Sequence, residues 1–142
     1  MTMARINIVT LGVSDLARSR AFYEALGWKA SSASQDSIVF LKGSNISLAL
    51  FGREALAHDA QVADQPTGFS AVTFAYNAAS KAEVDKLFAN AKAAGATAFK
   101  PPQDVFWGGY SSYMADPDGH IWEIAFNPFI PFDENGNLAL PD

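Results

Sequence analysis

One order of predicted elements occurs twice in this chain, and the doubling limits the folds that the chain can adopt. Each copy begins with a β-rich strand, continues with an amphipathic helix and ends with three short strands. The first copy covers residues 5–51 and the second covers residues 69–127. Because a repeat of about 60 residues is too long for a solenoid, we expect two similar βαβββ modules that pack side by side.

Both predicted helices have start and stop signals. Ser14 and Asp15 precede apolar residues at three- and four-residue spacing, and Gly27 stands where this helix would end. In the second copy, Ser80 and Glu83 form a capping box, and Gly95 stands at the C-cap. The strands are expected, in chain order, at residues 5–13, 29–32, 37–41, 46–51, 69–76, 97–100, 110–115 and 120–126.

The segments between and after the modules are expected to be irregular. Residues 52–68 are a connector with one helical turn at most, and the tail at 128–142 lies over a sheet edge or a partner subunit through its aromatic side chains. Pro101 and Pro102 are expected to stop the strand that begins at residue 97, and the Asp-Pro-Asp-Gly sequence at 116–119 predicts a turn. We therefore predict one domain that spans residues 1–142.

Composition excludes several functions. The formal net charge is −5 and the 10 Lys and Arg residues form no cluster, so we expect no nucleic-acid partner. There is no run of about 18 apolar residues and no signal-peptide pattern at the start, so neither a membrane span nor secretion is expected and the predicted location is the cytoplasm. The chain has 0 Cys, so any chemistry must come from His, carboxylate, Tyr or Trp side chains.

Strand alternation assigns candidate residues to faces. Ile6, Ile8 and Thr10 share one face of the first strand, and Phe69, Ala71 and Thr73 share one face of the fifth. The bulkier residues between them should pack on the helices, which leaves Thr10 and Thr73 to line a concave sheet. In the last strand, Glu123 shares a face with Ile121 and Ala125, and if this face is the concave one, its carboxylate is partly removed from water and its pKa is raised. Glu123 is thus the leading catalytic candidate, and the alternative is a structural carboxylate that hydrogen-bonds to Tyr or Trp donors.

Four aromatic residues near the second module's turn are candidate ligand-binding residues: Phe106, Trp107, Tyr110 and Tyr113. They would favour a flat or apolar ligand, and ordinary core packing remains the alternative for Phe106 and Tyr113. His120 and Glu123 have an H-x-x-E spacing, but on a strand this spacing places the two side chains on opposite faces. His120 is therefore expected to be a surface residue beside the turn, and His58 a solvated residue of the connector.

The chain resembles a known family through its opening and closing segments. These are residues 9–15 (VTLGVSD) with Phe22, Tyr23, Leu26 and Gly27, and residues 116–123 (DPDGHIWE). Together with the doubled order they resemble the vicinal oxygen chelate superfamily, also called the glyoxalase/bleomycin-resistance/extradiol-dioxygenase fold. The resemblance implies an α+β fold of two βαβββ modules, a cupped mixed sheet around one pocket, a helix outside each module, and a homodimer.

The resemblance also implies where metal-dependent members of the superfamily would hold an ion. By position, the four ligand places fall on Ile8, Leu48 or its neighbour, Ala71 and Glu123. Only Glu123 has a metal-binding side chain, and one carboxylate does not meet the demand of a divalent first-row ion for three or four donors. We therefore predict no metal and no other cofactor, and we expect neither glyoxalase I nor extradiol dioxygenase activity.

Two functions are consistent with this sequence. In the first, the chain is a glyoxalase-like enzyme in which Glu123 acts as general base or acid on a small carbonyl or aromatic compound, with Trp107 and Tyr113 placing it. In the second, the chain sequesters a planar small molecule without catalysis, as bleomycin-resistance members of the superfamily do. The sequence leaves both open, since function depends on the site and not on the fold.

Overall fold

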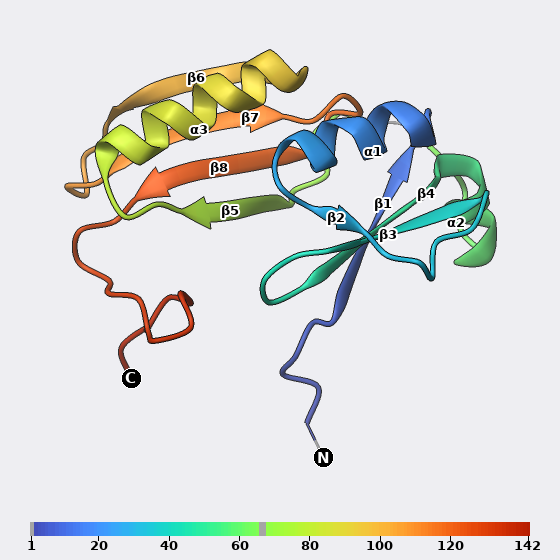
Figure 1. Cartoon of the computed structure of the whole chain (residues 1–142), viewed down its shortest axis with the longest axis horizontal. Coiled ribbons are helices and arrows are strands. Elements are labelled where there is room, and N and C mark those ends of the chain that lie inside the picture. The colour runs from blue at the N-terminus through green and yellow to red at the C-terminus, as the bar shows by residue number, and fades with distance from the viewer. Residues whose placement is uncertain (1, 66–67) are drawn as a thin grey trace. The chain divides into compact units, whose positions relative to one another are not determined.

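Each half of the chain forms a four-stranded mixed sheet with a helix packed on it (Figure 1). The computed structural model describes residues 2–65 and 68–142. The chain divides into two compact units, Met1–Ala71 and Val72–Asp142. The expected α+β class and the doubled βαβββ order are confirmed. Pro66 and Thr67, which belong to the predicted connector, lie outside the described residues.

The first unit contains β1 (Ile8–Val13), α1 (Leu16–Ala25), β2 (Lys29–Ala30), β3 (Ile38–Lys42), β4 (Ser47–Gly52) and α2 (Arg53–Asp59). Its sheet has the order β1-β4-β3-β2. β1 runs parallel to β4, and the other pairs are antiparallel. The parallel pair needs a long crossover, which α1, β2 and β3 together supply.

The core of the first unit lies between its sheet and α1. Buried residues on one face of the sheet and on the helix form it: Leu11, Val13, Val39, Leu41, Leu48 and Leu50 with Ser19, Phe22 and Tyr23. The opposite face is open near Ile8, which is 49% exposed. At Gly12 it is covered, since a Cβ there would lie 3.4 Å from the Leu56 side chain of α2. The bulkier set of β1 residues thus faces α1, as the alternation predicts, and α2 covers part of the other face.

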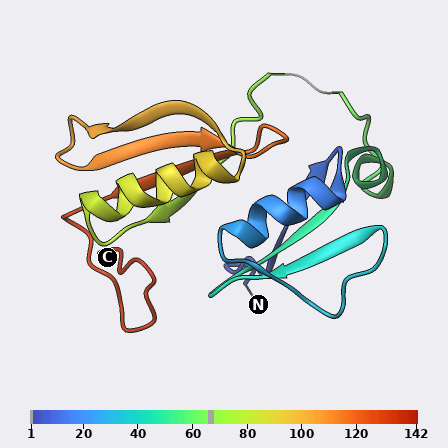
Figure 2. The same cartoon turned by 45° about the horizontal axis from the view of Figure 1, so that its top comes forward.

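The second unit contains β5 (Thr73–Asn77), α3 (Lys81–Ala94), β6 (Thr97–Asp104), β7 (Tyr110–Ala115) and β8 (Ile121–Phe126). Its sheet has the order β5-β8-β7-β6, with β5 parallel to β8 and the other pairs antiparallel. α3 lies along one face of this sheet in both Figure 1 and Figure 2. The two sheets therefore have the same topology.

Tyrosine hydroxyls identify the face of the second sheet that α3 covers. Tyr76 of β5 donates to Glu83 of α3 at 3.1 Å, and Tyr110 of β7 donates to Asp85 of α3 at 2.7 Å. Because side chains alternate along a strand, the residues beside these tyrosines point away from α3. This second face is called the open face of the second sheet below.

The capping signals are confirmed at both long helices. The Asp15 side chain accepts from Arg18 N at the start of α1, and the Ser80 side chain accepts from Glu83 N at the start of α3. Gly95 ends α3 with a φ of 116°, a left-handed conformation that glycine adopts without steric cost. Glu83 also accepts from Ala79 N at 2.9 Å, so it satisfies a backbone donor just outside the helix.

Several expected element bounds are wrong: β1 begins at Ile8 and not at residue 5, β2 ends at Ala30 and not at residue 32, and larger differences occur at β6, β5 and the connector. β6 continues through Pro101 and Pro102 to Asp104; it is an edge strand with two register shifts, where a residue without an N–H is tolerated. β5 begins at Thr73 and not at residue 69, because Ala71 has a left-handed φ of 61° that interrupts an extended chain. The connector begins with the seven-residue helix α2, which contains His58, so His58 is helical and exposed.

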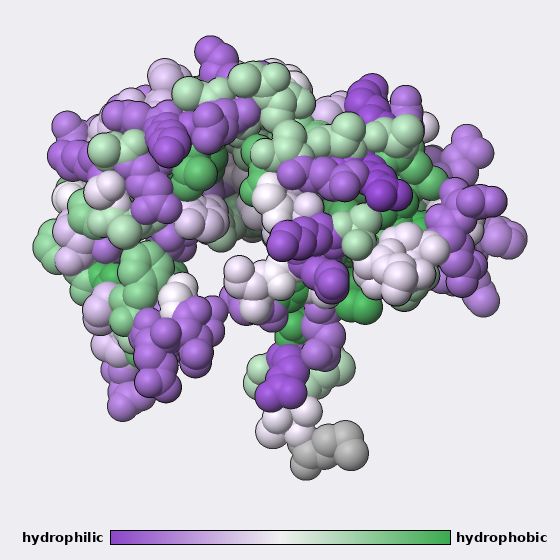
Figure 3. Space-filling view, in the orientation of Figure 1, coloured by the Kyte–Doolittle hydropathy of each residue, from purple (hydrophilic) through white to green (hydrophobic). Residues whose placement is uncertain are grey.

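The C-terminal tail folds back on itself through a bridge between Phe132 and Leu138. Its Phe129 ring lies against the turn between β6 and β7, where a Cβ on Gly108 would be 2.9 Å from that ring. Phe129 is nevertheless 70% exposed, and Figure 3 shows hydrophobic residues interspersed with hydrophilic ones on the face that it draws. None of the helices in the described part of the chain combines the length and the apolar character that crossing a membrane requires.

Candidate functional site

The open face of the second sheet presents three rows of side chains that cross all four strands. Residues paired across neighbouring strands lie side by side on one face of a sheet. Each row is given in the order β5, β8, β7 and β6. The central row is Ala75, Glu123, Tyr113 and Lys100. The row on one side is Asn77, Ala125, Ser111 and Gln103, and the row on the other side is Thr73, Ile121, Ala115 and Thr97. The central row therefore holds a carboxylate, a phenol and an ammonium group.

Glu123 is held by a hydroxyl donor of β7 and lies beside a phenol of the same strand. The Ser111 hydroxyl donates to Glu123 Oε2 at 2.6 Å, and Tyr113 is paired with Glu123 across β7 and β8. Ser111 is only 2% exposed, so its hydroxyl is a fixed donor and not a mobile surface group. The carboxylate thus has a defined position on the face that α3 does not cover.

The environment of Tyr113 keeps its hydroxyl protonated. Burial raises the pKa of Tyr113 above 10.0, and the negative charge of Glu123 raises this pKa further. A phenol with a raised pKa stays neutral near pH 7 and serves as a hydrogen-bond donor. The pair therefore combines a proton acceptor with a neutral donor.

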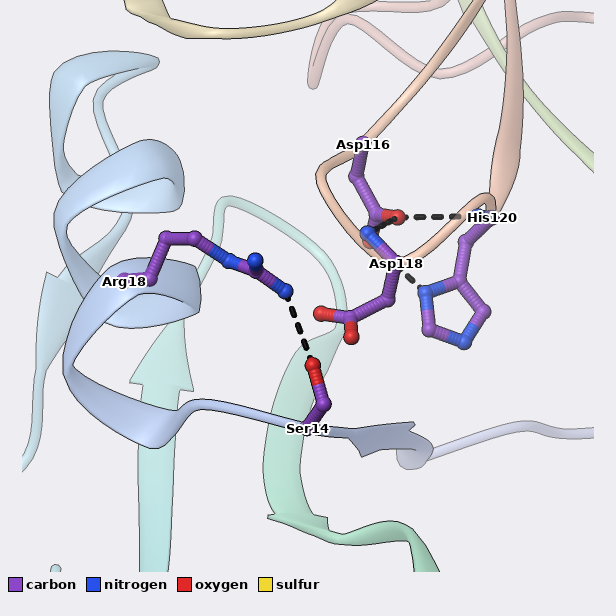
Figure 4. A network of polar contacts seen from close by, with 5 residues as sticks. All are labelled: Ser14, Arg18, Asp116, Asp118 and His120. Carbon is purple, nitrogen blue, oxygen red and sulfur yellow. Dashed lines mark hydrogen bonds and ion pairs between the residues drawn. The ribbon is translucent and has the colours of Figure 1, made fainter.

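A polar turn holds the beginning of β8, the strand that carries Glu123. Asp116, which is 2% exposed, accepts through Oδ1 from the backbone N–H groups of Asp118 and His120. Its other oxygen lies 2.7 Å from Nδ1 of His120 (Figure 4). The sequence places His120 at the surface, but its side chain is only 24% exposed. His120 lies outside β8, and these contacts account for both residues as parts of the turn.

The aromatic candidates do not form one cluster. Tyr110 and Tyr113 lie on opposite faces of the second sheet, because they are three residues apart on one strand. Phe106 is fully exposed in the turn between β6 and β7, and the Trp107 ring covers Gly109, where a Cβ would overlap it. Only Tyr113 shares a face with Glu123 among these four. Ligand binding by the other three stays a prediction.

The remaining candidates have separate locations. Thr73 begins β5 and flanks the Glu123 row, so it belongs to the same face. Thr10 lies on the first sheet, exposed and paired with Ala49 of β4. In the first unit, the Arg18 guanidinium reaches back 2.9 Å to the Ser14 hydroxyl and braces the start of α1 (Figure 4).

The four positions of the superfamily's metal ligands do not fit a metal ion. Leu48 is buried on the α1 side of its sheet, and its neighbours on the other side are Ser47 and Ala49. Ala71 precedes β5 and has no donor atom in its side chain. Within residues 2–65 and 68–142, no three His, Asp or Glu side chains gather where they could hold an ion. Glu123 is therefore the only carboxylate among these four positions, and its neighbours across the sheet include the hydroxyl groups of Ser111 and Tyr113.

A comparison with models of protein families agrees with the doubled βαβββ fold and the turn at residues 116–119. The model of the glyoxalase/bleomycin resistance protein/dioxygenase superfamily matches residues 5–124. The chain belongs to this superfamily. None of the curated proteins compared with the chain matches it.

Solved structures of this superfamily resemble the chain over nearly its whole length. A glyoxalase-related enzyme from Fulvimarina pelagi is 34% identical with a TM-score of 0.87, and the match covers 99% of this chain and 100% of that one. A glyoxalase/bleomycin resistance protein/dioxygenase from Nocardioides is 26% identical with a TM-score of 0.74, over 89% of this chain and 85% of that one. A lactoylglutathione lyase from Agrobacterium tumefaciens is 26% identical with a TM-score of 0.65, over 89% and 96%.

Sequence reasoning missed two residues of the open face. Ser111 was not a candidate, although it is two residues before Tyr113 and hence on the same face of a predicted strand. Lys100 was placed at the end of a strand that stops at the prolines. The alternation of β7 could have identified Ser111, whereas no local signal reveals which residue of β6 lies opposite Tyr113.

Proposed function

We propose that this chain is a glyoxalase-like protein that acts on a small carbonyl or aromatic molecule at the open face of its second sheet, with Glu123 as the proton acceptor. The observation that carries the proposal is the position of Glu123, on the face away from α3, with the Ser111 hydroxyl donating to its carboxylate and Tyr113 paired opposite it. A fixed carboxylate beside a neutral phenol is a common arrangement for general acid–base catalysis.

The reaction that suits this pair is proton removal next to a carbonyl group. Glu123 takes a proton from the carbon beside the carbonyl, and the electron pair of that C–H bond moves onto the carbonyl oxygen. The Tyr113 hydroxyl donates a hydrogen bond to this oxygen as its charge develops, while Ser111 keeps the carboxylate in place. The relative from Agrobacterium tumefaciens that is named a lactoylglutathione lyase supports a carbonyl substrate.

Binding without catalysis is the second candidate function, and the residues at the four metal-ligand positions favour it. Of the four positions where metal-dependent members carry ligands, only Glu123 has a donor suited to a divalent ion. A protein that had kept the cavity but not the metal chemistry would show this pattern. In that case Glu123 accepts a hydrogen bond from the ligand and transfers no proton.

The variant Glu123→Gln separates the two candidates, because glutamine keeps the shape of the side chain but accepts no proton near pH 7. Ligands are first found by thermal shift with a panel of small carbonyl and aromatic compounds, since a ligand that binds the native state raises the Tm. Turnover and affinity are then measured for each ligand. We expect turnover to fall by about 100-fold or more in this variant, with affinity within about threefold.

The matched control is Glu134→Gln, which makes the same change at an exposed position of the tail. It should leave both turnover and affinity unchanged. Equal turnover by wild type and Glu123→Gln would contradict the role of Glu123 as a base. Loss of affinity in Glu123→Gln, in a protein that turns over none of its ligands, would establish the second candidate instead.

A further inference from the structure

We propose that Lys100 binds an anionic group of the ligand, so that the ligand is a small carboxylate that also carries a carbonyl or aromatic group. This inference rests on the proposed function, because it assigns a ligand class to the same open face. It comes from the central row of that face, where Lys100 pairs with Tyr113 and Tyr113 pairs with Glu123.

Lys100 is partly buried, whereas its neighbours Phe99 and Pro101 on β6 are exposed. It lies at a register shift of the edge strand, directly opposite Tyr113. In the described part of the chain its ammonium group has no hydrogen-bond or ion-pair partner. By contrast, Lys81 of the same unit lies 2.7 Å from Asp104.

An ammonium group without a counter-ion can bind an anionic ligand directly. A charge-assisted hydrogen bond is about twice as strong as a neutral one. A carboxylate on the ligand would supply both the charge and the acceptor oxygens. The chain's net charge of −5 repels anions at long range, so a local cation favours the binding of one.

The separation of the two charged groups sets the length of the ligand. Lys100 and Glu123 lie two strands apart, which corresponds to roughly 10 Å at the usual spacing of neighbouring strands. A ligand anion over β6 stays clear of the Glu123 carboxylate and avoids repulsion by a like charge. Its carbonyl group then lies over Tyr113 and Glu123, and a para-substituted benzene ring fills the gap between the ligand's carboxylate and its carbonyl group.

The test compares 4-acetylbenzoate with its uncharged methyl ester, and affinities are measured by NMR titration at low salt. In the wild type the acid should bind at least about fivefold more tightly than the ester. Lys100→Met should reduce the affinity for the acid to that for the ester and leave the ester unchanged. Lys100→Arg, which keeps the charge, should restore most of the preference for the acid.

Lys86→Met is the matched control, because Lys86 is an exposed lysine of α3 and the substitution changes net charge equally. This control should bind the acid as the wild type does. If Lys100→Met does not fold, Lys100→Gln replaces it, and the comparison of acid with ester in the wild type needs no variant.

Several results would overturn the assignment to Lys100. These are equal binding of acid and ester by the wild type, unchanged affinity of Lys100→Met for the acid, or no binding of the acid at about 10 mM. The proposed function fails separately, when Glu123→Gln keeps full turnover and affinity for the ligands found by the thermal-shift screen. If the ester binds as tightly as the acid and its binding depends on Glu123, the proposed function stands and the role of Lys100 is refuted.

Discussion

Three tyrosines of the second unit share one kind of contact at the scale of single residues. Each lies beside a carboxylate: the Tyr76 and Tyr110 hydroxyls donate to Glu83 and Asp85, and Tyr113 is paired with Glu123 across two strands. The pKa of each tyrosine is raised above 10.0. Burial is the largest cause for Tyr76 and Tyr113, and the hydrogen bond to Asp85 is the largest cause for Tyr110.

These raised pKa values predict that the protein loses stability in alkaline solution. A tyrosine with a raised pKa in the folded state keeps its proton at a pH where the unfolded chain has released it. The associated stability is fully present below pH 10.0 and is lost as the pH rises through the pKa values of the folded state. We expect the free energy of unfolding, measured with urea, to fall between about pH 9 and about pH 11.

The contribution of Tyr113 can be isolated by comparing Glu123→Gln with Glu134→Gln. Both variants lose one carboxylate, but only Glu123→Gln removes the charge that raises the pKa of Tyr113. The free energy of unfolding of Glu123→Gln should therefore fall less steeply with rising pH than that of Glu134→Gln. Identical pH dependence in the two variants would show that Glu123 does not act on Tyr113.

At the scale of elements, β6 differs most from its expected form. A strand with two consecutive prolines is tolerated at the edge of a sheet, where the missing N–H groups need no partner. The register shifts on either side of Lys100 absorb the extra residues. The same irregularity places Lys100 opposite Tyr113, so an edge strand supplies part of the proposed ligand site.

The N-terminus of α3 provides a prediction about stability at this scale. Ser80→Ala removes the side chain that accepts from Glu83 N at 3.1 Å. It should lower the free energy of unfolding by about 1 kcal/mol, as measured by urea denaturation. Ser44→Ala in an exposed turn of the first unit is the control and should stay within about 0.5 kcal/mol of the wild type. Equal values for both variants would mean that Ser80 does not act as a cap.

For the whole molecule, we predict a homodimer. Family resemblance implies pairing, and large apolar side chains such as Phe106 and Phe129 are exposed on the second unit. Light scattering after size exclusion should give twice the chain mass of 15.2 kDa. Phe129→Ser should shift the protein towards the monomer, because Phe129 is 70% exposed and its loss removes apolar contact area. A mass of 15.2 kDa at all concentrations tested would refute the prediction.

Features that depend on neighbouring residues could be predicted from the sequence alone. The caps at Asp15 and Ser80, the end of α3 at Gly95 and the grouping of Glu123 with Ile121 and Ala125 on one face all follow from local spacing, whereas the side on which α3 packs does not. Hydrogen bonds within a helix turn and the alternation along a strand involve residues close in the chain, so a single sequence contains them.

Only the tertiary structure decided which strands are neighbours and in what register. Lys100, Tyr113 and Glu123 are far apart in the chain, and they form one row because β6, β7 and β8 pair as they do. A shift of one residue in either pairing would turn a side chain to the other face. Strand alternation has the same period in every register, so the sequence fixes the face of each residue along its own strand but not its partners across the sheet.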